Sequence, residues 1–375
     1  MGSSSLSLSR IVSACSLALL VRDFVAAIVT TTTTTTTTSR RPRTFLVTGS
    51  TDGIGRHTCR RLASDGHMLL VHGRRDPSDP VVETLVRDLE DRGASRVAYL
   101  RADLGDLEQV RNLAEDAVAQ LRSWQLPPED DRSMPALDCL INNAGVFDPT
   151  PRRSAQGFDA TMAVNVLAPF VLTRALLPCL IRGSDARIVT TSSVSQSRTL
   201  PDLDSLFARR FDGERRNDDG TNDQYHDFEP LPYSAHSSYA HSKLGDLLFT
   251  VQLSRLLSSY RPPEDDLLRT TSASLLLENL RRIQCLTMDP GTVNTKMLLA
   301  GWGPCGIPVG EANNTYILAT SDEYAFGARA AKSGSYHFGW GMSDYARDDA
   351  RLVDFWNKLS DCTGVSYDDL SRDCF

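Results

Sequence analysis

The feature that most constrains the fold of this chain is its alternation of short apolar runs with longer segments of helical spacing. The apolar runs end at glycine, as FLVT does before Gly49 and MLLVH before Gly73. Such strands, separated by helices and joined by right-handed crossovers, form an α/β fold, a doubly wound parallel sheet covered by helices on both faces. Strands are predicted at Phe45–Thr48, Met68–His72, Arg96–Leu100, Leu137–Ile141, Arg187–Thr191, Ile283–Met288 and Ser335–Phe338, and helices at Gly55–Ser64, Pro80–Arg92, Leu107–Leu121, Phe158–Ile181 and Ser238–Tyr260.

Composition excludes several classes of protein. The chain has 40 Lys and Arg against 47 Asp and Glu, and this net charge of −7 argues against a broad nucleic-acid surface. The mean hydropathy of −0.25 argues against a polytopic membrane protein. The eight cysteines include no C-x-x-C pair, which indicates reduced thiols and neither a disulfide framework nor a metal site.

Residues 1–42 do not have the pattern of a folded domain. They are rich in Ser and Arg, hold one acidic residue, Asp23, and include the unbroken run Thr30–Thr38. We expect a disordered leader that acts as an organelle transit peptide, for a plastid or a mitochondrion. Two other interpretations are a signal peptide or membrane anchor, and a disordered tail without a targeting signal on a cytoplasmic protein. Because Ile11–Val29 carries Arg22 and Asp23 at its centre, we expect no stable transmembrane span.

One α/β domain is predicted over residues 43–345. Three polar stretches, at 125–135, 203–231 and 261–274, lack an apolar period and are interpreted as surface insertions. Residues 346–375 predict a C-terminal helix and a polar tail, and we expect this piece to pack on the sheet or on a partner subunit. The apolar face of that helix comprises Leu352, Phe355, Trp356 and Leu359.

A glycine-rich loop, TGSTDGIG at 48–55, joins the first predicted strand to the first helix. Gly49 allows the tight turn, Gly53 lets the backbone approach a diphosphate, and Gly55 allows close packing of helix on strand. The helix N-terminus adds free N–H groups and a positive dipole end. Three glycines alone also fit a flexible turn, but the strand before and the helix after favour a dinucleotide site. The predicted contacts are Gly49, Ser50, Thr51, Gly53, Ile54 and Gly55.

The ends of the second and third strands predict which dinucleotide binds. Arg74 and Arg75 follow the second strand, where a basic pair favours a 2′-phosphate and an acid would favour a 2′-hydroxyl. We therefore expect NADP(H) rather than NAD(H), the alternative being two ordinary surface arginines. Asp103 and Leu104 follow the third strand and are placed to contact the adenine, with a helix cap as the alternative role.

Tyr239 and Lys243 lie one helical turn apart in the helix predicted at Ser238–Tyr260. A free tyrosine has a pKa of about 10, and a neighbouring ammonium lowers that pKa by stabilising the phenolate. Taken alone, such a pair is usually a surface pair. Ser193, which follows the fifth strand, lies at the carboxyl edge of the sheet, where open α/β folds bind ligands.

Two further polar groups belong to the same region. The segment Asn142–Gly145 (NNAG) follows the fourth strand at the same edge. Asn165 lies within the next predicted helix, where an asparagine is mildly unfavourable, so a specific bonding role is plausible. The alternative is a satisfied polar residue on a helix face.

With these residues in this order, the sequence resembles the short-chain dehydrogenase/reductase superfamily in its single-domain branch. Within it, the chain is most similar to the retinol-dehydrogenase-like and carbonyl-reductase members. The resemblance spans about residues 43–300 and implies a Rossmann-type sheet of seven strands. It is carried by TGSTDGIG at 48–55, NNAG at 142–145, VNVLAPF around Asn165, TTSS at 190–193, YAHSK at 239–243 and DPGTVNT at 289–295.

The resemblance implies a role for each matching residue. Tyr239 is the proton donor or acceptor, Lys243 lowers its pKa and bonds the nicotinamide ribose, Ser193 orients the substrate oxygen, and Asn165 holds a water that relays protons. The long interval between Ser193 and Tyr239, which contains the 203–231 insertion, departs from most members. Besides Tyr239 and Lys243, the implied cofactor contacts in this part of the chain are Asn143, Ala144, Gly145, Pro290, Gly291, Val293 and Thr295.

The function expected from the sequence is hydride transfer between NADP(H) and a carbonyl or alcohol carbon of a small molecule. A non-catalytic dinucleotide-binding redox sensor or assembly partner is the alternative, as is a nucleotide-sugar epimerase, against which the glycine spacing argues. Apolar residues within 293–314, such as Met297 and Trp302, suggest a lid and a hydrophobic substrate. The resemblance also suggests a homodimer or homotetramer.

Overall fold

The computed structural model describes residues 41–127, 130, 133–196, 203–208, 233–262, 271–328, 333–339, 341–368 and 370. The chain divides into two units, Met1–Arg41 and Pro42–Phe375, and the second holds nearly all of the described residues. The leader predicted at 1–42 therefore lies almost wholly outside the described residues. So do the middle of each predicted insertion and the last residues of the predicted tail.

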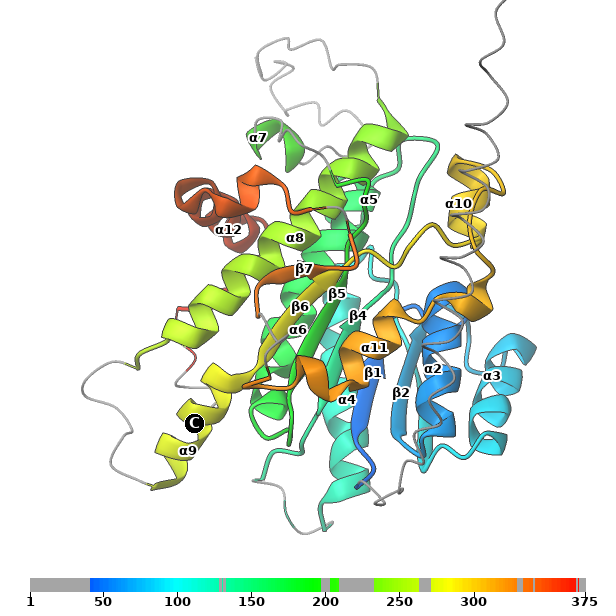
Figure 1. Cartoon of the computed structure of the whole chain (residues 1–375), viewed down its shortest axis with the longest axis vertical. Helices are drawn as coiled ribbons and strands as arrows, with labels where there is room; N and C mark the ends of the chain where they lie inside the picture. The colour runs from blue at the N-terminus through cyan, green and yellow to red at the C-terminus, as the bar shows by residue number, and fades with distance from the viewer. Residues whose placement is uncertain are drawn as a thin grey trace, which may run out of the picture. The chain divides into compact units, whose positions relative to one another are not determined.

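The core of the domain is a seven-stranded sheet in the order β3-β2-β1-β4-β5-β6-β7, with every neighbouring pair parallel (Figure 1). This confirms the predicted doubly wound fold. Strand order reverses between β1 and β4, and ligands bind at the carboxyl ends of strands beside such a reversal. The strands are β1 Thr44–Val47, β2 Met68–Gly73, β3 Arg96–Arg101, β4 Cys139–Asn142, β5 Arg187–Thr191, β6 Gln284–Met288 and β7 Ser335–His337.

Side chains alternate between two hydrophobic layers, one on each face of the sheet. On β1, Leu46 joins the layer under α4, α6 and α8, whereas Phe45 and Val47 join the layer under α2, α3 and α11. Both faces are buried, which is why the strands read as continuous apolar runs. The covering helices are α2 Gly53–Ser64, α3 Pro80–Asp91, α4 Leu107–Gln125, α6 Ala168–Leu180, α8 Ala235–Ser259, α9 Thr271–Arg282, α11 Asn314–Thr320 and α12 Asp349–Thr363.

Several shorter elements complete the described parts of the chain. They are α5 Ala160–Met162, the π-helix η1 Ala163–Leu167, α7 Leu203–Leu206, α10 Lys296–Gly301, and the 3₁₀ turns η2 Val309–Glu311, η3 Asp322–Tyr324 and η4 Asp344–Arg347. The helix predicted at Phe158–Ile181 is thus interrupted by a π turn. The run Ala160–Leu180 is apolar and long enough to cross a membrane, but 83% of its apolar 18-residue window is buried inside the domain, as in a core helix.

Two stretches predicted as solvated insertions begin or end in packed structure. The stretch at 261–274 runs into α9, whose Ala273, Leu277 and Leu280 are buried on one face at helical spacing. The stretch at 203–231 begins with α7, and Phe207 just after it is 3% exposed against Phe355. Within the described parts of the two stretches, the domain buries Ala273 in 261–274 and Phe207 in 203–231.

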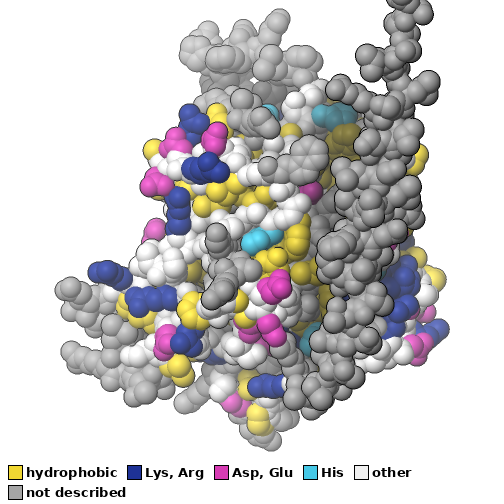
Figure 2. Space-filling view, in the orientation of Figure 1, with side chains coloured by type: hydrophobic (Ala, Val, Ile, Leu, Met, Phe, Trp, Pro, Cys, Tyr) yellow, Lys and Arg dark blue, Asp and Glu magenta, His cyan; other side chains and the backbone are white. Residues whose placement is uncertain are grey.

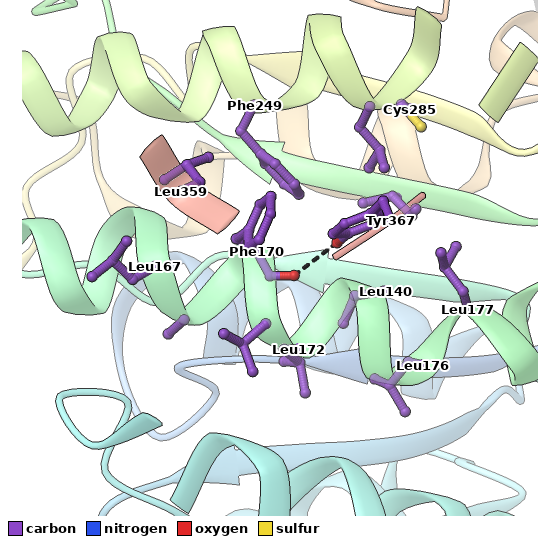
Figure 3. Packing of buried hydrophobic residues seen from close by; sticks show 14 of the residues in the cluster. Leu140, Leu167, Phe170, Leu172, Leu176, Leu177, Phe249, Cys285, Leu359 and Tyr367 are labelled. Atoms are coloured by element: carbon purple, nitrogen blue, oxygen red, sulfur yellow. Dashed lines mark hydrogen bonds between the residues drawn. The ribbon is translucent and has the colours of Figure 1, made fainter. Parts of the chain in front are cut away.

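The C-terminal segment completes the core on the α6 and α8 side of the sheet. Asp348 caps the N-terminus of α12, and Gly364 ends the helix with a φ of 67°. The chain then places Tyr367, which is 1% exposed, beside Phe170 of α6 and Phe249 of α8 (Figure 3). The Tyr367 hydroxyl donates a 2.7 Å hydrogen bond to the carbonyl of Phe170. On the outer side of α12, basic and acidic side chains are intermixed (Figure 2).

Candidate active site

A cavity of about 660 Å³ lies at the carboxyl ends of the strands and gathers most of the predicted site residues. It extends from the glycine-rich loop after β1, past the segment after β4, to Tyr239 on α8 and to α10. The predicted residues that line it are Gly49, Thr51, Gly53, Ile54, Gly55, Arg74, Asp103, Leu104, Asn143, Ala144, Gly145, Ser193, Tyr239, Lys243, Pro290, Gly291, Val293 and Thr295.

The glycine-rich loop needs its glycines for two different reasons. Gly49 and Gly53 have φ values of 68° and 55°, in the left-handed region that favours glycine. Gly55 is required by space, because a Cβ there would lie 2.3 Å from the carbonyl oxygen of Gly49 and 2.5 Å from Asn143 Nδ2. The loop leads into α2, which Asp52 caps by accepting a hydrogen bond from the Gly53 N–H. The N-terminus of α2 therefore opens onto the cavity.

His72, at the end of β2, holds this loop and was not singled out from the sequence. Its Nδ1 accepts a 3.2 Å hydrogen bond from the Gly49 N–H, and its Nε2 donates at 3.1 Å to the carbonyl of Ala102. These bonds use one ring nitrogen as acceptor and the other as donor, which is the neutral imidazole. Burial lowers the pKa of His72 to about 4, so the neutral form persists at physiological pH.

Three predicted site residues do not line the cavity. The Ser50 side chain is fully buried, and its hydroxyl donates to the carbonyl of Val47 and accepts from the His72 N–H, so it braces the loop from behind. Arg75 forms an ion pair with Asp79, at 2.7 Å. Of the predicted arginine pair, only Arg74 lines the cavity. The third residue is Asn165.

Asn165 lies in the π-helix η1 and is 1% exposed. Its Oδ1 accepts a 2.8 Å hydrogen bond from the Val146 N–H, and its Nδ2 donates to the Val146 carbonyl and, at 2.9 Å, to Ser242 Oγ. The side chain thus ties the segment after β4 to α8. These bonds use both N–H groups of Nδ2 and one of the two acceptor positions of Oδ1, and the water that the resemblance implies stays a prediction.

Tyr239 and Lys243 share one face of α8 at the inner end of the cavity, and both are less than a tenth exposed. The Lys243 Nζ lies 5.6 Å from the centre of the Tyr239 ring. Burial raises the pKa of the Tyr239 phenol, and the charge of Lys243 and a hydrogen bond with Ser193 lower it. Lys243 therefore lowers the pKa of Tyr239, as predicted, but burial has the larger effect on that pKa.

The two serines after β5 have different environments. Ser192 is buried, and its hydroxyl donates a 2.6 Å hydrogen bond to the backbone carbonyl of Lys243. Ser193 lines the cavity, and its Oγ accepts from the Ser195 N–H at 3.0 Å. Its hydroxyl also contacts the Tyr239 phenol, so Ser193 and Tyr239 face the cavity together, and the role that the resemblance implies for Ser193 stays a prediction.

Trp302 lines the cavity next to Tyr239 and belongs to a cluster of aromatic rings. The centre of the Trp302 ring lies 5.5 Å from that of Tyr239, 4.8 Å from that of Phe147 and 5.1 Å from that of His236. Met297 and Leu298 of α10 line the same region. The segment predicted as an apolar lid, 293–314, meets the cavity with Met297, Leu298 and Trp302 but also with the polar Thr295 and Lys296. Phe147 and His236, which contact Trp302, were missed because they come from other parts of the chain.

Comparison with known proteins identifies the family of this chain. The sequence model of a family described as short chain dehydrogenase matches residues 43–203. Polyprenol dehydrogenase of Mus musculus is 30% identical over 265 residues, which cover 69% of this chain and 63% of the relative. Retinol dehydrogenase 11 of Mus musculus is 30% identical over 213 residues, 56% of each protein. The chain thus spans a little under two thirds of the length of the polyprenol dehydrogenases that it matches.

Solved structures show the same fold at lower sequence identity. An NADPH-bound carbonyl reductase from chicken fatty liver superposes with a TM-score of 0.51 at 19% identity and covers 81% of this chain and 98% of its own. A blue fluorescent protein from a metagenomic library, in complex with NADPH, superposes with a TM-score of 0.50 at 23% identity, covering 80% and 97%. With its parallel seven-stranded sheet, glycine-rich loop and Ser-Tyr-Lys cavity, this chain belongs to the short-chain dehydrogenase/reductase superfamily.

Proposed function

We propose that the protein is an NADP(H)-dependent oxidoreductase that interconverts an alcohol and a carbonyl group on an apolar small molecule. The observation that carries this proposal is the meeting of Ser193, Tyr239 and Lys243 at one end of a cavity whose other end is the glycine-rich loop. A dinucleotide bridging the two ends would present its nicotinamide to the hydroxyl groups.

The residues present fit a dinucleotide phosphate. The close contact that a Cβ at Gly55 would make shows that the loop is packed without room for a side chain, and this brings the N-terminus of α2 to the cavity. Arg74, at the end of β2, supplies a guanidinium for a 2′-phosphate. Two proteins of the same fold, the carbonyl reductase and the blue fluorescent protein, bind NADPH, which supports the choice of NADP(H).

The chain's own residues orient the substrate and move one proton. Ser193 Oγ donates a hydrogen bond to the substrate oxygen, and the Tyr239 hydroxyl gives that oxygen a proton in reduction and takes it back in oxidation. The Lys243 ammonium stabilises the phenolate that remains. The nicotinamide supplies or accepts the hydride.

The apolar side chains near Tyr239 favour an apolar substrate. Trp302, Met297 and Leu298 line the cavity near Tyr239, so a chain or ring without charge gains most from burial there. The relatives named polyprenol dehydrogenase and retinol dehydrogenase support a hydrophobic alcohol or its carbonyl counterpart as substrate.

Substitution of Tyr239 by Phe tests the reaction. Tyr239→Phe should lower turnover of a panel of apolar aldehydes and ketones with NADPH by about 10²- to 10⁴-fold, because the proton donor is lost. NADPH affinity, measured by fluorescence titration, should stay the same. Tyr316→Phe is the matched control, because the Tyr316 hydroxyl bonds Asp65 outside the cavity and should be dispensable. Equal turnover in the wild type and Tyr239→Phe would contradict the proposal.

The two arginines after β2 test the cofactor. Arg74→Ala should weaken NADPH binding about tenfold or more while changing NADH binding little, since a charge-assisted bond to a 2′-phosphate is lost. Arg75→Ala is the control within the same loop, because Arg75 is paired with Asp79. A preference for NADPH that survives Arg74→Ala would rule out this role for Arg74.

A further inference from the structure

A buried carboxylate contacts the lysine of the proposed site, and no part of the function above assigns it a role. Asp246 lies one turn after Lys243 on α8, and its Oδ2 is 2.8 Å from Lys243 Nζ. The side chains are 4% and 2% exposed, so this ion pair is shielded from solvent. Burying two charges is costly, and removing one partner leaves the other uncompensated.

The hydrogen bonds of Lys243 show how the ion pair with Asp246 fixes the position of the Lys243 ammonium. An ammonium has three N–H donors, and two of them are taken by Asp246 Oδ2 and by the carbonyl of Thr191, each at 2.8 Å. Lys243 also lines the cavity. The two fixed bonds, one to α8 and one to β5, therefore leave one N–H of Lys243 for a group bound in the cavity.

We propose that Asp246 is a positioning residue for the reaction: it holds Lys243 so that one N–H faces the cavity, and its negative charge sets the pH range in which Tyr239 exchanges its proton. This inference rests on the proposed function, in which Tyr239 moves the proton.

The charges around Tyr239 support the second half of the proposal. Lys243 favours the phenolate, while Asp246 on the same helix and Asp289 after β6 oppose it. Tyr336 of β7 also interacts electrostatically with Tyr239, because a charge on Tyr239 raises the pKa of Tyr336. Burial raises the pKa of the Asp246 carboxyl to about 6, and Lys243 opposes this rise, so the carboxylate is ionised at neutral pH. Asp246 thus offsets part of the effect of Lys243 on Tyr239.

Asp246→Asn separates charge from geometry. The amide oxygen of asparagine can still accept a hydrogen bond from Lys243, but the negative charge is gone. Burial lowers the pKa of the Lys243 ammonium and Asp246 raises it, so the two proteins are compared in the pH range in which Lys243 is protonated in both. In that range the ammonium is no longer offset, and the phenolate is favoured more strongly. The pH at which turnover is half-maximal in alcohol oxidation should therefore fall by about one unit or more. Asp246→Glu keeps the charge but moves the carboxylate, so it should keep the wild-type pH profile while raising the KM for NADP.

A second readout uses the cofactor-free protein. The absorbance of tyrosinate is measured against pH in the wild type and in Asp246→Asn. The curve of Tyr239→Phe is subtracted from the wild-type curve, and that of the double variant with Tyr239→Phe is subtracted from the Asp246→Asn curve, so that the ionisation of Tyr239 alone remains. Tyr239 should ionise at lower pH when Asp246→Asn is present. This titration needs neither cofactor nor substrate, so it reports on Asp246 even where the proposed reaction fails.

Asp138→Asn is the matched control for the loss of a buried carboxylate. Asp138 is 8% exposed and accepts hydrogen bonds from the Thr44 N–H and from Ser184, at the end of the sheet away from the cavity. Asp138→Asn should lower the melting temperature and leave the pH profile unchanged. The role of Asp246 would be overturned if turnover still depends on Tyr239 but the pH profile of Asp246→Asn coincides with that of the wild type or moves to higher pH. That result would leave the proposed function intact. Loss of that dependence on Tyr239 would overturn the proposed function instead.

Discussion

Acidification should destabilise this protein through His72, the side chain that ties the glycine-rich loop to the neighbouring strands. His72 is 2% exposed and uses both ring nitrogens in hydrogen bonds that require the neutral imidazole. Burial lowers its pKa from the usual 6.5 to about 4. A proton added at Nδ1 would face the N–H of Gly49, so the folded protein resists protonation there.

The sign and size of the effect follow from proton binding. Below pH 6.5 the unfolded chain takes up a proton on His72 that the folded protein does not bind, so stability falls as the pH decreases from about 6.5 to about 4. The gap between the two pKa values corresponds to about 3 kcal/mol in the free energy of unfolding, since one pKa unit is about 1.4 kcal/mol. Below about pH 4 this residue adds no further loss.

Urea unfolding at several pH values between about 7 and 4.5 measures this loss. His72→Gln keeps an amide that can donate and accept but does not titrate, so it should be less stable than the wild type at neutral pH and lose less stability on acidification. His67 and His241, whose pKa values burial also lowers, remain in both proteins and cancel in the comparison. Parallel stability curves for the two proteins would refute the reasoning.

Two further substitutions test the loop and the C-terminal segment. Gly55→Ala should weaken NADPH binding about tenfold or more in a fluorescence titration, because the added Cβ would lie 2.3 Å from the carbonyl oxygen of Gly49. Gly310→Ala is the control: a Cβ there has no atom within 4 Å, so this variant should bind NADPH as the wild type does. Tyr367→Phe should lower the free energy of unfolding by about 1–2 kcal/mol through the lost hydrogen bond to Phe170, and an unchanged urea midpoint would show that this buried bond contributes nothing.

The fold could be predicted because its signals are local. The runs at Phe45 and Met68 end where the strands end, at glycines that the loops require. The spacing of Tyr239 and Lys243 likewise fixes that both share a helix face, whatever the rest of the chain does. The Lys243–Asp246 pair carries the same kind of signal, at a spacing of three, and could have been found from the sequence.

The remaining features depend on contacts between distant parts of the chain. Nothing near Asn165 indicates that its amide bonds Val146 and Ser242, or that a π turn surrounds it. Ser50 looks like a cofactor contact because it stands in the glycine-rich loop, but the loop turns its hydroxyl towards Val47. Such outcomes are set by tertiary packing, which a single sequence does not display.

The position of Tyr367 has a consequence for synthesis of the chain. Its hydroxyl bonds a carbonyl 197 residues earlier, and its ring fills the interior between α6 and α8. Until the segment that carries Tyr367 has been synthesised, Phe170 and Trp356 lack this packing partner. Folding of this half of the domain can therefore finish only after that segment has joined the interior, and a chain that lacks Tyr367 would leave a cavity beside Phe170.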